Sequence, residues 1–164
     1  MTAHEQAIAT TPDREIVITR TFDAPRELVF AVWTDPKHLV HWWGPNGFTT
    51  TIQEMNVTPG GTWRLIMRGP DGRDYHNKIV FDEVAKPERL VYRHLGEPGT
   101  EPVRFQTTVT FAERDRRTEV TLRMVFDTNE ARDTVIKTYH AVEGGKQTLG
   151  RLAGYLATRD GAVR

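Results

Sequence analysis

One stretch near the C-terminus, residues 129–158, constrains the fold of this chain more than any other. Apolar residues recur along it at steps of three and four positions, which is the spacing of one face of an α-helix. These residues are Val135, Tyr139, Val142, Leu149, Leu152 and Leu156. At ~1.5 Å per residue such a helix would be about 45 Å long, and its apolar face must be buried. The rest of the chain offers mainly strands, so we expect a curved sheet closed over this helix.

Seven segments alternate apolar and polar residues, which is the pattern of strands that bury one face. The alternation is clear in residues 103–111, where Val103, Phe105 and Val109 share a side. Short turns such as Pro-Gly-Gly at 59–61 separate the segments and favour antiparallel neighbours. In residues 73–84 two faces compete, and we interpret the face with Tyr75 and Ile79 as the inner one. The expected strands are residues 15–22, 48–55, 62–68, 73–84, 90–95, 103–111 and 118–126.

Two short helices are expected between the first strand and the second. Asp-Ala-Pro at 23–25 is typical of a helix start, and Asp-Pro at 35–36 ends this helix and begins another over residues 37–43. The fold class is therefore α+β, with a seven-stranded curved antiparallel sheet wrapped around a long C-terminal helix. We expect one domain over residues 14–158, a loosely ordered tail at 1–13 and a short C-terminal tail at 159–164.

Composition narrows the range of functions. The chain has 22 basic and 22 acidic residues, so its overall charge gives no reason to expect nucleic-acid binding. It contains neither cysteine nor serine, which excludes disulfide bonds and mechanisms with a Ser or Cys nucleophile. No apolar stretch is long enough for membrane insertion, and residues 1–13 lack the features of a signal peptide. A cytoplasmic protein is therefore expected.

Five spaced motifs resemble those of a known family. They are RTFDAPRELVF at 20–30, WWGP at 42–45, PGGTW at 59–63, PERLV at 87–91 and the helix segment 144–156. In this order they resemble homologues of the activator of the heat-shock-protein-90 ATPase, within the START and birch-pollen-allergen (SRPBCC) superfamily. The resemblance extends from about residue 14 to residue 157. It implies the helix-grip fold and a cavity between sheet and helix, in which single-domain bacterial members are regarded as binding small apolar ligands.

The residues expected to contact such a ligand lie on the inner strand faces, after the second short helix and on the C-terminal helix. Aromatic and methionine side chains suit adaptable apolar recognition, although the same side chains also suit a solid core. Asn77, Tyr92, His94 and Tyr139 are the groups expected to hydrogen-bond one oxygen of the ligand. The full set is Trp43, Phe48, Trp63, Leu65, Met67, Tyr75, Asn77, Phe81, Tyr92, His94, Phe105, Met124, Val135, Tyr139 and Val142.

Two further segments have features that bear on the cavity. Residues 42–48 combine large aromatic residues with Gly, Pro and Asn, which indicates a loop across one mouth of the groove that gates entry or anchors the short helix. Gly144 and Gly145 are unfavourable inside a helix by about 1 kcal/mol each relative to Ala. This pair predicts either a kink or a close approach of the helix backbone to another element.

The favoured function is binding or carriage of a small hydrophobic molecule, aromatic ones included, with no catalytic residue, metal or cofactor assigned. His38 and His41 stand three positions apart, as do His140 and Glu143, but neither pair has a recognisable third metal ligand. One alternative is an enzyme of the cyclase or hydratase type, in which His94 or a tyrosine moves a proton within the same cavity.

A second alternative is a protein-interaction domain that stimulates a chaperone ATPase. The eukaryotic activators of the resembling family carry a separate N-terminal domain that engages the chaperone, and this chain of 164 residues has no room for one. A chaperone partner is therefore the less favoured reading. Nothing in the sequence specifies an oligomeric state.

Overall fold

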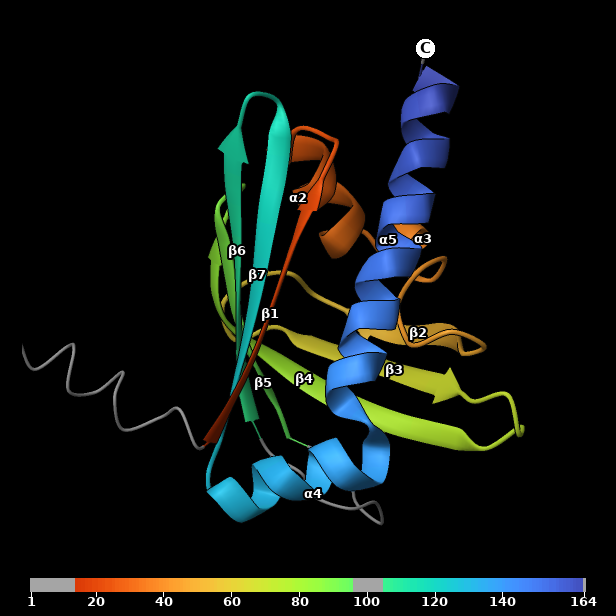
Figure 1. Cartoon of the computed structure of the whole chain (residues 1–164), viewed down its shortest axis with the longest axis vertical. Coiled ribbons are helices and arrows are strands. Elements are labelled where there is room, and N and C mark those ends of the chain that lie inside the picture. Colours follow the sequence, from red (N-terminus) through yellow and green to blue (C-terminus); the bar gives the residue numbers. More distant parts are fainter. Residues whose placement is uncertain (1–13, 96–104, 164) are drawn as a thin grey trace, which may run out of the picture.

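The computed structural model describes residues 14–95 and 105–163. Its strands form one antiparallel sheet in the order β1-β7-β6-β5-β4-β3-β2. Strands β2 to β7 are neighbours in sequence order, and β1 extends the sheet by pairing with β7. Figure 1 shows the sheet bent around the C-terminal helix. The strands are β1 Glu15–Phe22, β2 Thr49–Met55, β3 Thr62–Arg68, β4 Asp74–Ala85, β5 Arg89–His94, β6 Phe105–Arg114 and β7 Arg117–Phe126.

Two short helices connect β1 to β2, as predicted: α2 is Arg26–Thr34 and α3 is Pro36–Leu39. The Asp35 side chain begins α3 by accepting a hydrogen bond from the Lys37 backbone N–H at 3.0 Å. Pro36 then occupies the first turn, where its missing N–H costs nothing. α3 is shorter than the predicted helix at 37–43, because the chain turns after Leu39 and buries Trp42.

The C-terminal segment forms two helices, which corrects the prediction of a single helix over residues 129–158. α4 is Asn129–Tyr139 and α5 is Ala141–Val163. Between them, His140 has left-handed torsions of φ 52° and ψ 47°, and its N–H bonds to the Val135 carbonyl, which closes the last turn of α4. A single non-helical residue does not disturb the spacing of apolar residues, so the sequence pattern did not reveal the break.

The core lies between the inner face of the sheet and the helices α2, α3 and α5 (Figure 1). α5 contributes Leu149, Leu152 and Leu156, all of them buried. It passes close to β1 at Gly145, where an added Cβ would lie 2.5 Å from Cδ1 of Ile18. The close backbone approach predicted for the glycine pair is therefore present, whereas the break in the helix lies at His140.

The structure confirms the predicted helix-grip architecture. Seven antiparallel strands of the described chain curve around α5, and two short helices follow the first strand. In β4, Ile79 and Phe81 of the predicted inner face are buried, while Tyr75 and Asn77 are half-buried toward the rim. Within the described ranges, none of the helices combines the length and the apolar character that a membrane span requires.

Candidate ligand-binding cavity

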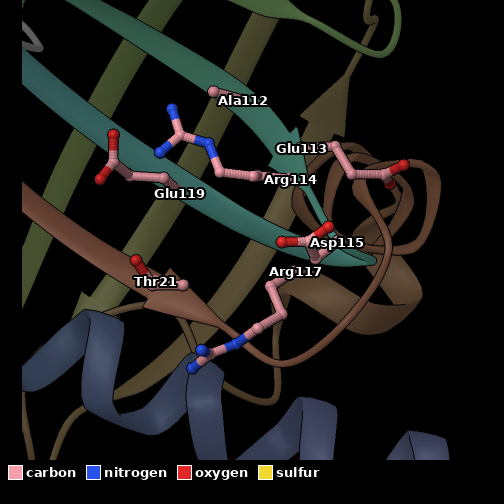
Figure 2. Close-up of a pocket in the computed structure, with 7 residues that line it drawn as sticks. All are labelled: Thr21, Ala112, Glu113, Arg114, Asp115, Arg117 and Glu119. Carbon is pink, nitrogen blue, oxygen red and sulfur yellow. The ribbon is translucent and has the colours of Figure 1, made fainter.

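Two hollows of similar size but different character stand out among the described residues. One lies at the hairpin between β6 and β7, has a volume of about 190 Å³, and is lined by charged residues such as Glu113, Arg114 and Arg117. Figure 2 shows charges of both signs around it, on the exposed end of the hairpin. Exposed charges of both signs are well solvated and gain little from one another. The second hollow, between the sheet and α5, is therefore the candidate site.

This second cavity has a volume of about 210 Å³ and opens to the surface. Its wall is built from five strands, α2, the loop after α3 and the first half of α5. Aromatic, aliphatic and methionine side chains dominate it, and no Asp, Glu, Lys or Arg of the described residues takes part. The lining residues are Trp33, Trp43, Gly44, Pro45, Leu65, Met67, Asn77, Ile79, Tyr92, His94, Phe105, Thr107, Leu122, Met124, Ala141, Gly144, Gly145, Thr148 and Leu149.

The structure brings many of the predicted ligand-contact residues together in this wall. Those that line it are Trp43, Leu65, Met67, Asn77, Tyr92, His94, Phe105 and Met124. They share the inner face because register partners in neighbouring strands, such as His94 and Phe105, point the same way. Residues predicted for the site that lie outside the cavity wall are Phe48, Trp63, Tyr75, Phe81, Val135 and Val142. The side chain of Tyr139 lies outside the described residues.

The residues outside the wall have other partners. Trp63 and Phe81 are fully buried and stack on each other, with ring centroids 5.9 Å apart and an interplanar angle of 7°, so they form the core behind the cavity. Phe48 and Tyr75 pair at the rim, with centroids 5.9 Å apart. Val135 packs in the core from α4. Strand alternation selects a face but does not tell which part of that face stays open.

Sequence reasoning missed several lining residues. Thr107, Leu122 and Ile79 lie on strand faces already identified as inner ones, so alternation alone could have found them. Small residues of α5, among them Ala141 and Gly144, leave the space that a larger side chain would fill. The contribution of Trp33 depends on how α2 packs on the sheet, which no local pattern reports.

An aromatic chain runs from the core into the cavity. The Trp33 ring contacts those of Trp42 and Trp43 edge-on at 4.9 and 6.1 Å, and Trp43 contacts Trp63 at 5.0 Å. All four tryptophans of the sequence therefore belong to one cluster at the cavity. Their fluorescence should report occupation of the cavity directly.

The polar groups of the wall are uncharged. Burial lowers the pKa of His94 to about 3, so its imidazole is neutral at physiological pH. His94 stacks on Phe105 at 4.1 Å, and the part of its surface that remains accessible belongs to the cavity wall. Burial likewise raises the pKa of the Tyr92 hydroxyl, an effect that the nearby indole N–H of Trp33 opposes. Asn77 donates its amide to the Tyr75 carbonyl at 3.1 Å, which leaves its amide oxygen as an acceptor.

Two buried indole N–H groups at the cavity have no hydrogen-bond partner among the described residues, those of Trp33 and Trp63. Trp33 lies in the cavity wall and Trp63 directly behind it. The indole N–H of Trp33 lies near the Tyr92 hydroxyl, but the two groups do not have the geometry of a hydrogen bond. A buried donor without a partner costs about 1–3 kcal/mol, and such groups in native proteins call for a specific explanation.

The loop after α3 is held over the cavity by α5. Nη1 of Arg151 donates to the carbonyls of Gly44 at 2.9 Å and Pro45 at 3.1 Å, and both of these loop residues line the cavity. The Gln147 side chain accepts a hydrogen bond from the Asn46 backbone N–H at 3.1 Å. Gly44 and Pro45 thus form part of the cavity wall, and two polar side chains of α5 fasten the loop that carries them.

The histidines of the two pairs noted in the sequence, His38 with His41 and His140 with Glu143, take part in packing or connecting the helices. Nδ1 of His38 lies 2.6 Å from the Tyr155 hydroxyl, and the His41 ring stacks on Tyr155 at 5.5 Å, so these residues fasten α3 to α5. His140 forms the left-handed link between α4 and α5. The described residues contain no cluster of three or more His, Cys, Asp or Glu side chains arranged to hold a metal ion.

Comparisons with known proteins agree with this architecture. The family model described as Activator of Hsp90 ATPase homolog 1-like protein matches residues 23–157. A solution structure of a protein from Arthrobacter aurescens is similar over 89% of this chain and 87% of that chain, with a TM-score of 0.83 and 26% identity. A crystal structure from Mycobacterium smegmatis is similar over 88% and 91%, with a TM-score of 0.80 and 25% identity.

A third structure, of a protein named AHSA1 from Silicibacter pomeroyi, is similar in fold over 88% of this chain and 99% of that chain, with a TM-score of 0.73 and 20% identity. No curated protein sequence matches the chain.

Proposed function

Because the chain belongs to the Activator of Hsp90 ATPase homolog 1-like protein family, which has the helix-grip fold, we propose that it binds a small apolar molecule between its sheet and α5. The observation that carries the proposal is the cavity itself, about 210 Å³ of mostly apolar space that opens to the surface. Ligand sites in proteins are concave, mostly apolar and equipped with few polar groups. This cavity has each of these properties.

The volume limits the size of the ligand. An engineered protein cavity of about 150 Å³ accommodates benzene, so 210 Å³ suits one aromatic ring with a small substituent. The best small ligands gain up to about 1.5 kcal/mol per non-hydrogen atom and larger ones about 0.3. A one-ring ligand with an intermediate value should therefore bind with a Kd between about 1 µM and 1 mM.

Thermal unfolding of the full chain with toluene, isopropylbenzene and phenol tests the proposal. A ligand at 100 times its Kd raises stability by about 2.7 kcal/mol, which corresponds to a rise in Tm of roughly 5–10 °C for a domain of this size. Quenching or shift of tryptophan fluorescence should accompany the rise, because Trp33 and Trp43 line the cavity.

Two variants on α5 decide where the ligand binds. Ala141→Trp places a large side chain in the cavity wall and should abolish the rise in Tm. Ala157→Trp makes the same change at an exposed position of the same helix and should keep it. If no neutral aromatic compound stabilises the protein, or if both variants respond alike, the cavity is not a ligand site.

A second candidate is stimulation of a chaperone ATPase, and the description of the family is the observation that favours it. The assay is the ATP hydrolysis rate of a purified Hsp90 with increasing amounts of the full chain. A rate that rises with a saturable dependence on the chain supports this candidate, and an unchanged rate without detectable binding eliminates it.

A further inference from the structure

The wall of the cavity contains a hydrogen-bond donor that no described residue satisfies. The buried indole N–H of Trp33 has no partner among the described residues. Tyr92 and Thr107, which face each other as register partners on β5 and β6, also line the cavity. Each of them has a hydroxyl group that can donate one hydrogen bond, and Trp33, Tyr92 and Thr107 are almost completely buried. We call these three residues the donor corner.

The donor corner should bind a hydrogen-bond acceptor that carries no charge. An ionised ligand would lose its hydration on entry, and a wall whose described residues include no Lys, Arg, Asp or Glu cannot replace it. His94 beside the corner is also neutral at physiological pH, because burial lowers its pKa to about 3. An uncharged oxygen can accept hydrogen bonds through its lone pairs without bringing a charge into the cavity.

The remainder of the wall favours a flat ring. Trp33, Trp43 and Phe105 present aromatic surfaces, and Met67 and Met124 present polarisable thioethers that adapt to a ring. The volume of about 210 Å³ accommodates one ring with a short substituent. A substituent that carries a carbonyl group can reach the donor corner while the ring stays in the apolar part.

We propose that the ligand is an uncharged one-ring aromatic carbonyl compound whose oxygen accepts hydrogen bonds from Trp33, Tyr92 and Thr107. This inference rests on the proposed function and adds the chemical class of the ligand. It assigns the buried indole N–H of Trp33 a partner that only the bound state supplies. The same contact orients the carbonyl toward β5 and β6.

Acetophenone and isopropylbenzene test the inference, because they have the same number of non-hydrogen atoms but only the first has a carbonyl. Their affinities are compared as a ratio in each variant, which cancels their different hydrophobicity. Tyr92→Phe and Thr107→Val remove one hydroxyl each and should weaken acetophenone by about 5-fold apiece, as expected for one hydrogen bond. Isopropylbenzene should bind these variants with unchanged or higher affinity.

The matched control is Thr108→Val, on the opposite face of the same strand, which should leave the ratio unchanged. A measurement on the unmodified chain is independent of the variants. In ¹H–¹⁵N NMR spectra, acetophenone should shift the indole signal of Trp33 downfield, whereas isopropylbenzene should not. Benzoate, which has the same size but is charged, should not bind at neutral pH.

The possible outcomes separate this inference from the proposed function. If both neutral compounds bind and the variants change their affinities equally, the donor corner does not contact the ligand and the inference is wrong, while the cavity remains a binding site. Binding of isopropylbenzene without acetophenone leads to the same conclusion. If no neutral aromatic compound binds, the inference falls together with the proposed function.

Discussion

Arg151 offers the most direct test of how the cavity is closed. Its Nη1 lies within hydrogen-bond distance of the carbonyls of Gly44, Pro45, Phe48 and Trp43, at 2.9 to 3.4 Å. Nη1 carries two hydrogens, so these contacts amount to two bonds at any moment. A hydrogen bond from a charged group contributes about 1.5–3 kcal/mol, which gives an upper limit of about 3–6 kcal/mol for the pair.

The net effect should be smaller than this limit, because the loop lies at the surface and its carbonyls regain water once released. We expect Arg151→Met, which keeps the apolar stem and removes every donor, to lower the free energy of unfolding by about 2 kcal/mol. With an m-value of about 2 kcal/mol/M, the urea midpoint should fall by about 1 M. Because Gly44 and Pro45 line the cavity, bound aromatic ligand should also dissociate faster.

Urea unfolding followed by circular dichroism gives the midpoint, and stopped-flow tryptophan fluorescence gives the dissociation rate. Arg89→Met is the control, since Arg89 is an exposed arginine whose ion-pair partner Glu83 lies on β4, and its own strand β5 pairs with β4 and β6 rather than with the strands that adjoin the loop. It should leave both quantities unchanged. If Arg151→Met behaves like Arg89→Met in both assays, Arg151 does not fasten the loop and the reasoning is refuted.

Three other perturbations have defined expectations. Burial lowers the pKa of His94 from 6.5 to about 3. The unfolded chain therefore binds the proton more tightly, and stability falls as the pH drops below about 6.5, by at most about 1.4 kcal/mol per pH unit. His94→Phe should flatten this slope in urea titrations, and an equal slope would contradict the assignment. Arg116→Gly should stabilise the β6–β7 hairpin by about 1 kcal/mol, because Arg116 has a φ of 66°; an unchanged thermal midpoint would count against backbone strain there. Gly154→Ala, with open space around its new Cβ, should raise the free energy of unfolding by about 1 kcal/mol. Gly145→Ala should raise it less or lower it, because the new Cβ meets Ile18. Equal gains in thermal unfolding would show that the close approach is not tight.

Several features of the fold were predicted from local patterns. β1 and β3 have the predicted bounds of 15–22 and 62–68, because strict alternation leaves one buried face and little freedom of register. The break at His140 was not predicted, since a left-handed residue changes the direction of the chain without changing the apolar spacing around it. The end of α3 was also misplaced, because the burial of Trp42 is decided by the neighbouring elements.

For the candidate site, too, the strand pattern identified some of the lining residues and misplaced others. Alternation placed Tyr92, His94 and Phe105 on the inner face, and they line the cavity. It placed Trp63 and Phe81 there as well, yet these two rings pack on each other behind the cavity. The separation between open and filled parts of one face depends on the distance to α5, which is a property of the assembled layers.

The sequence by itself determined the order of elements, the inner faces of the strands and the uncharged, aromatic character of what those faces present. These follow from side-chain chemistry and from periods of two and 3.6 residues, which are local. Only the tertiary structure decided that Trp33 reaches the cavity with an N–H that has no partner among the described residues, that Arg151 fastens the loop, and that α5 begins after a left-handed residue. The first two join segments far apart in the chain, and contacts of that kind are set by packing, which no local pattern contains. The left-handed residue is local, but it leaves the spacing of the apolar residues around it unchanged.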